Sequence, residues 1–130
     1  MSKIIKTLQD EHAALTSVLT NISKSEFHSP ERLELFKTLR TALVAHTEYE
    51  VKYFYDVLKN NSDIDEELRN VFEDDLIHTY KQTLDTLDTI IELGQENDGD
   101  LEFIIKTLSD RIQIEEKNLF PVYKACKSQQ

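Results

Sequence analysis

Glycine and proline are scarce in this sequence, and tryptophan is absent. The chain of 130 residues includes 2 glycines and 2 prolines, so few positions favour tight turns or interrupt a helix. Charged residues make up 31% of the chain and hydrophobic residues 39%, a balance typical of long amphipathic helices. Nothing here requires β structure. The length predicts one domain over residues 1–130, which can bury a core without disulfides or a structural metal.

Cysteine is nearly absent as well. Cys126 is alone, so no internal disulfide can form, which suits a reducing cytosol. The amino-terminal stretch MSKIIKTLQDEH has no apolar run of signal-peptide length, and no segment approaches the length that spans a membrane. We therefore expect a soluble cytoplasmic protein.

Positive charge is in short supply. Lysine and arginine number 15 against 25 aspartates and glutamates, which gives a formal net charge of -10. Such a surface repels phosphate backbones, and no basic face compensates for it. We therefore expect neither nucleic acid nor a membrane as a partner, and the acidic runs DEE and EDD are interpreted as solvated helix faces.

Breaks in the sequence predict four long helices. Ser29 followed by Pro30 is a cap residue with proline at the first helical position, where its missing N–H costs nothing. Residues 63–66 have the spacing of a capping box, Gly94 suits a left-handed helix end, and Pro121 should kink the last helix. The first predicted helix covers about residues 2–23, and the second runs from residues 29–30 to the KNNSD stretch at 59–63. The third runs from there to residue 94, and the fourth from about 98–100 towards 127. Three short connections predict an all-α, antiparallel up-down-up-down four-helix bundle.

Polar residues interrupt the apolar stripes of three of these helices. His12 completes a series with spacings of three and four residues in the first helix. His46 and Glu50 are in phase with the stripe of the second helix, and Arg111 and Glu115 with that of the fourth. We expect all five to point into the bundle. The apolar members of the stripes are Ile5, Leu8, Leu15, Leu19 and Ile22, then Phe36, Leu39, Leu43, Tyr53 and Val57, then Leu101, Ile104, Leu108, Leu119 and Val122.

Buried polar groups at these positions must be satisfied by one another or by an ion, because an unpaired one costs several kcal/mol. His46 and Glu50 stand one helical turn apart and can present nitrogen and oxygen to the same ion. His12 and Glu115 would complete a site of two imidazoles and two carboxylates, which suits iron, manganese or zinc better than calcium or magnesium. A single histidine in an apolar stripe is more often a hydrogen-bonded core residue, but convergence from three helices favours a metal site.

Three motifs in the chain are EH at residues 11–12, HxxxE at 46–50 and EExxLFP at 115–121. Through them the sequence resembles the hemerythrin, or HHE cation-binding, family, and the likeness covers essentially the whole chain. The resemblance implies a four-helix bundle around a non-haem di-iron centre. Such centres serve dioxygen binding, redox or iron sensing, or iron handling.

The resemblance also implies roles for individual residues. By motif, His12 and His46 would hold one iron, and Glu50 and Glu115 would be the bridging carboxylates. The second iron needs a further histidine at the start of the last motif, where this chain has Arg111. A guanidinium stays protonated, cannot coordinate a cation and would repel a second iron. We therefore expect a mononuclear site, with a di-iron centre as the alternative.

The third helix also lacks an obvious ligand for a second iron. His78 is turned about 100° away from the stripe residue Ile77, so it would reach the interior only through a π-bulge. Glu73 is in phase, and we predict that it points inwards at the level of Arg111. It would pair with the guanidinium, for which Glu115 is the other expected partner, or add an oxygen ligand to the remaining metal. The predicted stripe of this helix is Ile77, Tyr80, Leu84, Leu87 and Ile91.

These features predict a hemerythrin-like protein that binds iron, or else manganese or zinc, and senses or buffers iron or a diatomic ligand such as dioxygen. A missing second iron argues against an oxygen carrier and against an oxidase or ferroxidase. The alternative is a metal-free four-helix interaction module in which Arg111 and acidic residues form a salt-bridge network. Tyr53 is expected to pack inside with its hydroxyl hydrogen-bonded, for example to a ligand carboxylate. No activated nucleophile or phosphate-binding glycine loop is present, which favours a binding protein over an enzyme.

Overall fold

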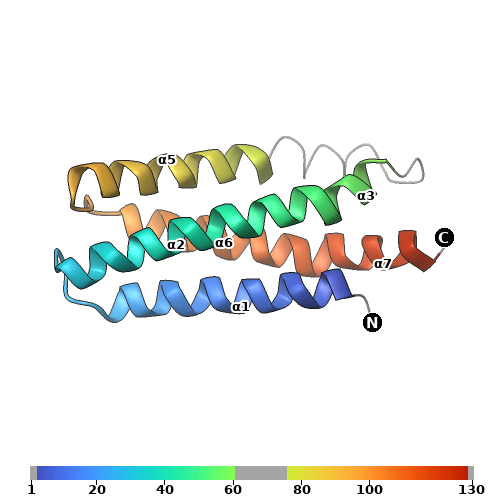
Figure 1. Cartoon of the computed structure of the whole chain (residues 1–130), viewed down its shortest axis with the longest axis horizontal. Helices are drawn as coiled ribbons and strands as arrows, with labels where there is room; N and C mark the ends of the chain where they lie inside the picture. The colour runs from blue at the N-terminus through green and yellow to red at the C-terminus, as the bar shows by residue number, and fades with distance from the viewer. Residues whose placement is uncertain (1–2, 61–75, 129–130) are drawn as a thin grey trace.

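The computed structural model describes residues 3–60 and 76–128, and every regular element within them is helical (Figure 1). In chain order the elements are α1 (Lys3–Lys24), α2 (Pro30–Tyr49), η1 (Glu50–Tyr55), α3 (Asp56–Lys59), α5 (Ile77–Leu93), α6 (Asp100–Ile114), η3 (Glu115–Leu119) and α7 (Phe120–Ser128), where η marks a π-helix. None of these helices is long and apolar enough to cross a membrane.

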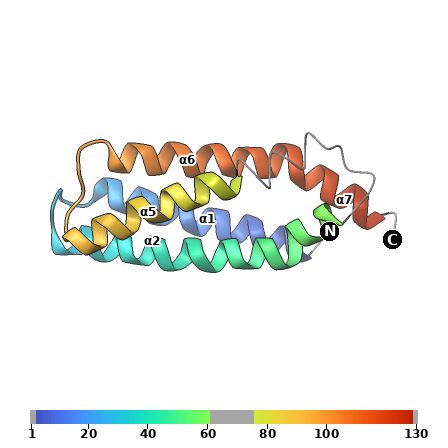
Figure 2. The same ribbon diagram turned by 90° about the horizontal axis from the view of Figure 1, so that it is seen from above.

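The helices form an elongated bundle. Elements α2, η1 and α3 follow one another as one rod, and α6, η3 and α7 form a second rod along the length of the bundle (Figure 2). Both α1 and α5 pack against each of these rods. The predicted all-α four-helix bundle is therefore confirmed.

Two of the predicted helix boundaries can be seen directly. The Ser29 hydroxyl accepts a hydrogen bond from the backbone N–H of Arg32 at 3.1 Å, and Pro30 takes the first position of α2. Helix α5 ends at Gly94, whose φ of 74° is a left-handed conformation that glycine adopts without steric cost. The capping box expected at residues 63–66 lies outside the described residues.

The core consists of two apolar clusters with a polar layer between them. The terminal cluster lies toward the end of the bundle where both chain ends are found, and the connection cluster lies toward the opposite end (Figure 1). The polar layer, between 0% and 4% exposed, comprises His12, His46, Glu50, Arg111 and Glu115. The terminal cluster comprises Ile5, Leu8, Phe54, Tyr55, Leu58, Leu76, Leu119, Phe120 and Tyr123. The connection cluster comprises Leu15, Leu19, Ile22, Phe36, Leu39, Leu43, Leu87, Ile90, Leu101, Ile104 and Leu108.

A π-helical turn begins at each of the two buried glutamates. Element η1 starts at Glu50 and η3 at Glu115. A π-helix has i→i+5 hydrogen bonds, so it fits more residues into a turn than an α-helix and shifts the inward phase along the chain. Tyr53 was predicted on the inward stripe but is 42% exposed, because the buried position has moved to Tyr55. The prediction for Tyr53 was therefore wrong.

The last helix shows the same displacement. Tyr123 is buried, whereas Val122, which was predicted to point inwards, is only partly buried. The π-helical turn ends at Leu119, two residues before Pro121. Helix α7 begins at Phe120 and continues through Pro121, and the kink expected at this proline stays a prediction.

The third helix is buried along a different line from the predicted one. Leu76 is buried and Ile77 is 39% exposed, which reverses the prediction. His78 is exposed and does not enter the interior. The apolar residues of this segment lie on two adjacent faces of the helix. Tertiary packing buries the face that the sequence pattern did not favour. The residues of α5 and its cap that are buried are Leu76, Thr83, Leu87 and Ile90, with Tyr80 partly buried.

Candidate metal centre

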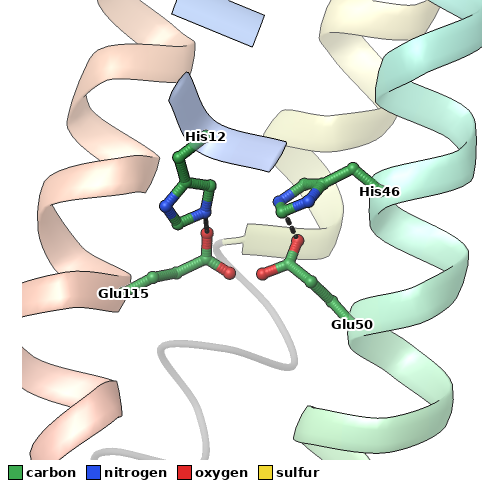
Figure 3. Close-up of side chains that lie close together, drawn as sticks. All are labelled: His12, His46, Glu50 and Glu115. Carbon is green, nitrogen blue, oxygen red and sulfur yellow. Dashed lines mark hydrogen bonds and ion pairs between the residues drawn. The ribbon is translucent and has the colours of Figure 1, made fainter. Parts of the chain in front are cut away.

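Four donor side chains meet in the middle of the bundle. His12 comes from α1, His46 from α2, Glu50 from the first residue of η1 and Glu115 from the first residue of η3. One ligating atom from each lies within 4.8 Å of the others. Figure 3 shows the two imidazoles and the two carboxylates turned toward one another. Two nitrogens and two oxygens form a donor set that suits iron, manganese or zinc.

Each histidine turns Nε2 toward a buried carboxylate. The Nε2 atom of His46 is 3.0 Å from Glu50 Oε1, one turn further along the same rod. The Nε2 atom of His12 is 3.2 Å from Glu115 Oε1, which belongs to a different helix. The two rings meet edge to face with centroids 4.9 Å apart. The four groups therefore converge on one small volume through Nε2 and Oε1 atoms.

Two further carboxylates hold the outer nitrogens of the rings. Glu11 Oε1 lies 2.7 Å from His46 Nδ1, and Glu116 Oε2 lies 2.8 Å from His12 Nδ1. An ionised carboxylate can only accept, so each ring keeps its proton on Nδ1 when a metal ion occupies the Nε2 side. The lone pair of Nε2 is then directed at the site, as in carboxylate–histidine–metal arrangements.

Tyr55 fixes the second oxygen of Glu115. Its hydroxyl donates to Glu115 Oε2 at 2.6 Å, which leaves Oε1 facing His12. Burial, and then the charge of Glu50, raise the pKa of the Tyr55 hydroxyl, so it stays protonated and donates. The hydrogen bond to a carboxylate that was expected of Tyr53 is made by Tyr55.

Arg111 lies in the same layer and binds Glu50. Its Nη2 donates to Glu50 Oε1 at 2.7 Å, while its Nε is 3.9 Å from Glu115 Oε1. The guanidinium carbon is 5.6 Å from the centroid of the Tyr80 ring, which is a cation–π contact. The sequence predicted Glu115 or Glu73 as the partner. The longer contact with Glu115 is present, the nearer partner Glu50 was not predicted, and Glu73 lies outside the described residues.

Three buried atoms of Glu50 and Arg111 have no hydrogen-bond partner in the described part of the chain, namely Glu50 Oε2, Arg111 Nε and Arg111 Nη1. Unsatisfied polar atoms are rare in protein interiors and cost free energy, so these need an explanation. A cation beside Glu50 would satisfy its second oxygen. The open oxygen and the donor set therefore fit a metal ion held by His12, His46, Glu50 and Glu115.

The sequence matches the family model of the hemerythrin HHE cation-binding domain over residues 3–123. The chain belongs to this family. The matched residues include the whole polar layer and both apolar clusters of this HHE domain. No curated protein and no solved structure matches the chain. The family model describes a cation-binding domain, and the buried cluster of His12, His46, Glu50 and Glu115 is the group of residues that could hold a cation.

The charges of the HHE domain are coupled across the polar layer. Burial alone would raise the pKa of Glu50, but Arg111 and then His46 outweigh it and lower this pKa, so the carboxylate is ionised. Burial opposes a charge on His46, yet contacts with Glu50 and Glu11 raise its pKa. Burial dominates for His12 and lowers its pKa. His46 is therefore the ring that more readily takes a second proton, and a metal ion would compete with that proton.

The sequence prediction missed the residues that hold the donor side chains in place. Glu11 and Glu116 stand beside His12 and Glu115 in the EH and EE motifs, about 100° round the helix from an inward position. A carboxylate at that angle reaches a neighbouring helix, so the motifs contained a usable signal. Tyr55 was missed because the π-helical turn changed the phase, and the apolar periodicity gave no sign of that turn.

Proposed function

We propose that this HHE domain binds one transition-metal ion, iron in preference to manganese or zinc, through His12, His46, Glu50 and Glu115. The supporting observation is the orientation of both imidazoles, each with Nδ1 on an outer carboxylate and Nε2 facing an inner one. The Nε2 atom and the inner carboxylate oxygen are both satisfied only when a proton or a metal ion lies between them. One divalent ion would satisfy both rings and both inner carboxylates at once.

We propose further that Arg111 takes the place of a second metal ion. It is buried, it pairs with Glu50, and it cannot release its proton, so it provides one fixed positive charge beside the site. The α5 helix offers no replacement ligand at His78, which is exposed. Glu73 remains a proposed partner of Arg111 or an additional oxygen ligand.

A single-metal centre suits sensing or buffering better than oxygen carriage, which in this family takes two electrons from two irons. Bound iron would supply redox chemistry and affinity for a diatomic ligand such as dioxygen. The protein groups hold the donors ready: Arg111 keeps Glu50 ionised, and Tyr55 holds Glu115. We therefore propose that the domain senses or buffers iron or a small diatomic ligand in the cytoplasm.

Metal content tests this proposal. Protein purified from iron-supplemented cells should contain about one equivalent of iron by elemental analysis and absorb in the near ultraviolet. The His46→Ala variant should lose the metal, because it removes a donor nitrogen. The His78→Ala variant is the matched control and should keep it, because that histidine is exposed. Less than about a tenth of an equivalent of any transition metal in the unsubstituted protein would refute the proposal.

A metal-free interaction module is the second candidate function, and the contact between Arg111 and Glu50 favours it. In that case Arg111 and His46 are the permanent partners of the buried Glu50 carboxylate, and the polar layer is purely structural. A chelator separates the two functions. Removing bound metal lowers the thermal stability of a metal-binding protein, whereas an interaction module is unaffected by chelator.

A further inference from the structure

Glu11 and Glu116 connect the buried histidines with the edge of the bundle. Their side chains are 32% and 38% exposed, whereas the two histidines that they contact are 3% exposed. Each carboxylate reaches inwards to Nδ1 of an imidazole, at 2.7 Å for Glu11 and 2.8 Å for Glu116. Both pairs are therefore short, charge-assisted contacts between a partly solvated acceptor and a buried ring.

The two contacts cross from helix to helix. Glu11 precedes His12 on α1, but it contacts the ring of His46 on α2. Glu116 follows Glu115 on η3, but it contacts the ring of His12 on α1. Each ring is thus oriented by a neighbouring helix, so its orientation depends on how the helices pack.

A carboxylate at Nδ1 has two effects on an imidazole. It fixes which ring nitrogen has the free lone pair, and it makes that nitrogen a stronger donor to a metal ion. The His12 ring also stacks on Phe120 with centroids 5.9 Å apart, which restricts rotation of the ring. The contact with Glu116 then determines which edge of the ring faces the site.

We propose that Glu11 and Glu116 are positioning residues that set the metal affinity of this centre, by holding His46 and His12 with Nε2 directed at the ion. The inference rests on the metal-binding function proposed above. Outer-shell partners of metal-bound histidines are worth about 10-fold to 100-fold in affinity. Loss of either carboxylate should therefore weaken binding although every metal ligand is retained.

Substitutions at these two positions test the inference by zinc affinity, measured in competition with a chromophoric chelator. Glu11→Ala and Glu116→Ala remove the acceptor and should weaken binding about 10-fold to 100-fold. Glu11→Gln and Glu116→Gln keep an oxygen that accepts Nδ1–H and should lose less. Asp10→Asn and Asp110→Asn are matched controls, because each removes one negative charge near Glu11 or Arg111 in the sequence, from a carboxylate that pairs with a surface lysine. The controls should stay within about twofold of the unsubstituted protein.

The ring tautomers give a readout that needs no metal. Two-bond nitrogen–proton correlations distinguish Nδ1–H from Nε2–H in the metal-free protein above the pH at which the rings titrate. We expect Nδ1–H for both rings in the unsubstituted protein and in the glutamine variants. The ring of His46 should change to Nε2–H in Glu11→Ala, and the ring of His12 in Glu116→Ala. A merely structural role for these carboxylates would not select one tautomer in this way.

Failure of this inference and failure of metal binding give different results. Alanine variants that bind zinc within about twofold of the unsubstituted protein, or charge controls that lose as much, would overturn the positioning role alone. Unchanged tautomers in the alanine variants would overturn it too. If an alanine variant fails to fold, a methionine variant at the same position takes its place, because it also removes the acceptor while keeping the side-chain volume. Unchanged zinc affinity in that variant contradicts the inference. Less than about a tenth of an equivalent of iron, manganese or zinc in the unsubstituted protein would instead refute the proposed function.

Discussion

Replacing Arg111 with methionine removes the fixed positive charge from the polar layer and keeps much of the side-chain length. Glu50 is fully buried and would lose its partner at 2.7 Å, and breaking a buried ion pair in this way costs about 3–5 kcal/mol. Two guanidinium atoms, Nε and Nη1, that have no hydrogen-bond partner among the described residues disappear at the same time, which offsets part of this cost. We therefore expect the free energy of unfolding of the metal-free protein to fall by about 2–4 kcal/mol.

The same substitution should strengthen metal binding. Glu50 Oε1 is shared between Arg111 Nη2 and His46 Nε2, so the guanidinium competes with a metal ion for this oxygen. Methionine would leave both oxygens of Glu50 to the ion and would remove the repulsion between two positive charges. We expect zinc affinity to rise by at least about tenfold, which corresponds to about 1.4 kcal/mol.

Urea unfolding followed by circular dichroism, in chelator and in excess zinc, separates the two effects. In chelator Arg111→Met should unfold at lower urea, and zinc at a hundred times its dissociation constant should restore about 2.7 kcal/mol. Arg40→Met is the matched control, because Arg40 pairs with Asp88 on the surface and should leave the urea midpoint nearly unchanged. Unchanged stability of Arg111→Met in chelator would refute the stabilising role of the buried pair. Weaker zinc binding would refute the competition for Glu50.

Three further outcomes are expected. Arg111→His should leave the metal content near one equivalent, because His78 is exposed and gives a second ion no ligand from α5; two equivalents by elemental analysis would contradict this. Tyr55→Phe should lower the free energy of unfolding by about 1–3 kcal/mol, because Glu115 Oε2 loses its buried donor. A change below about 0.5 kcal/mol in urea unfolding would contradict this role of the hydroxyl. Zinc affinity should rise with pH through the pKa of His46, which is raised above 6.5. In the metal-free protein the stability that His46 contributes is complete below about pH 6.5 and is lost as pH rises through that raised pKa. If zinc affinity and stability were both constant from about pH 6 to 9, the upward shift of the His46 pKa would be contradicted.

Helical phase was sufficient to bring the donor residues together, because α1 and α2 stay regular as far as Glu50. Counting in steps of three and four residues therefore placed His12, His46 and Glu50 correctly in the interior. Beyond Glu50 the same counting favoured Tyr53, whereas Tyr55 is buried. The residues there read YFY, so either phase offers aromatic side chains to the core, and hydrophobicity alone could not reveal the π-helical turn.

The sequence could not show which carboxylate pairs most closely with Arg111, and the reason is a different one. Phase places Arg111, Glu50 and Glu115 in one layer, but the choice between the two carboxylates depends on distances of 2.7 Å and 3.9 Å. Differences of this size are set by side-chain conformations and by how the helices are rotated against one another. The neighbours Leu76 and Ile77 raise the same difficulty, because both are apolar and only packing decides which is buried.

The polar layer divides the core into the terminal cluster and the connection cluster, here called the terminal block and the connection block, and contiguous parts of a protein such as these can open as local cooperative units. Transient opening of the terminal block would admit water to Glu50 and Glu115 while the connection block stayed folded. A metal ion bound in the polar layer would lie between the two blocks and link them. If the ion binds only while the terminal block is closed, its binding free energy adds to the free energy of opening that block. Metal occupancy would then set how often this end of the bundle frays.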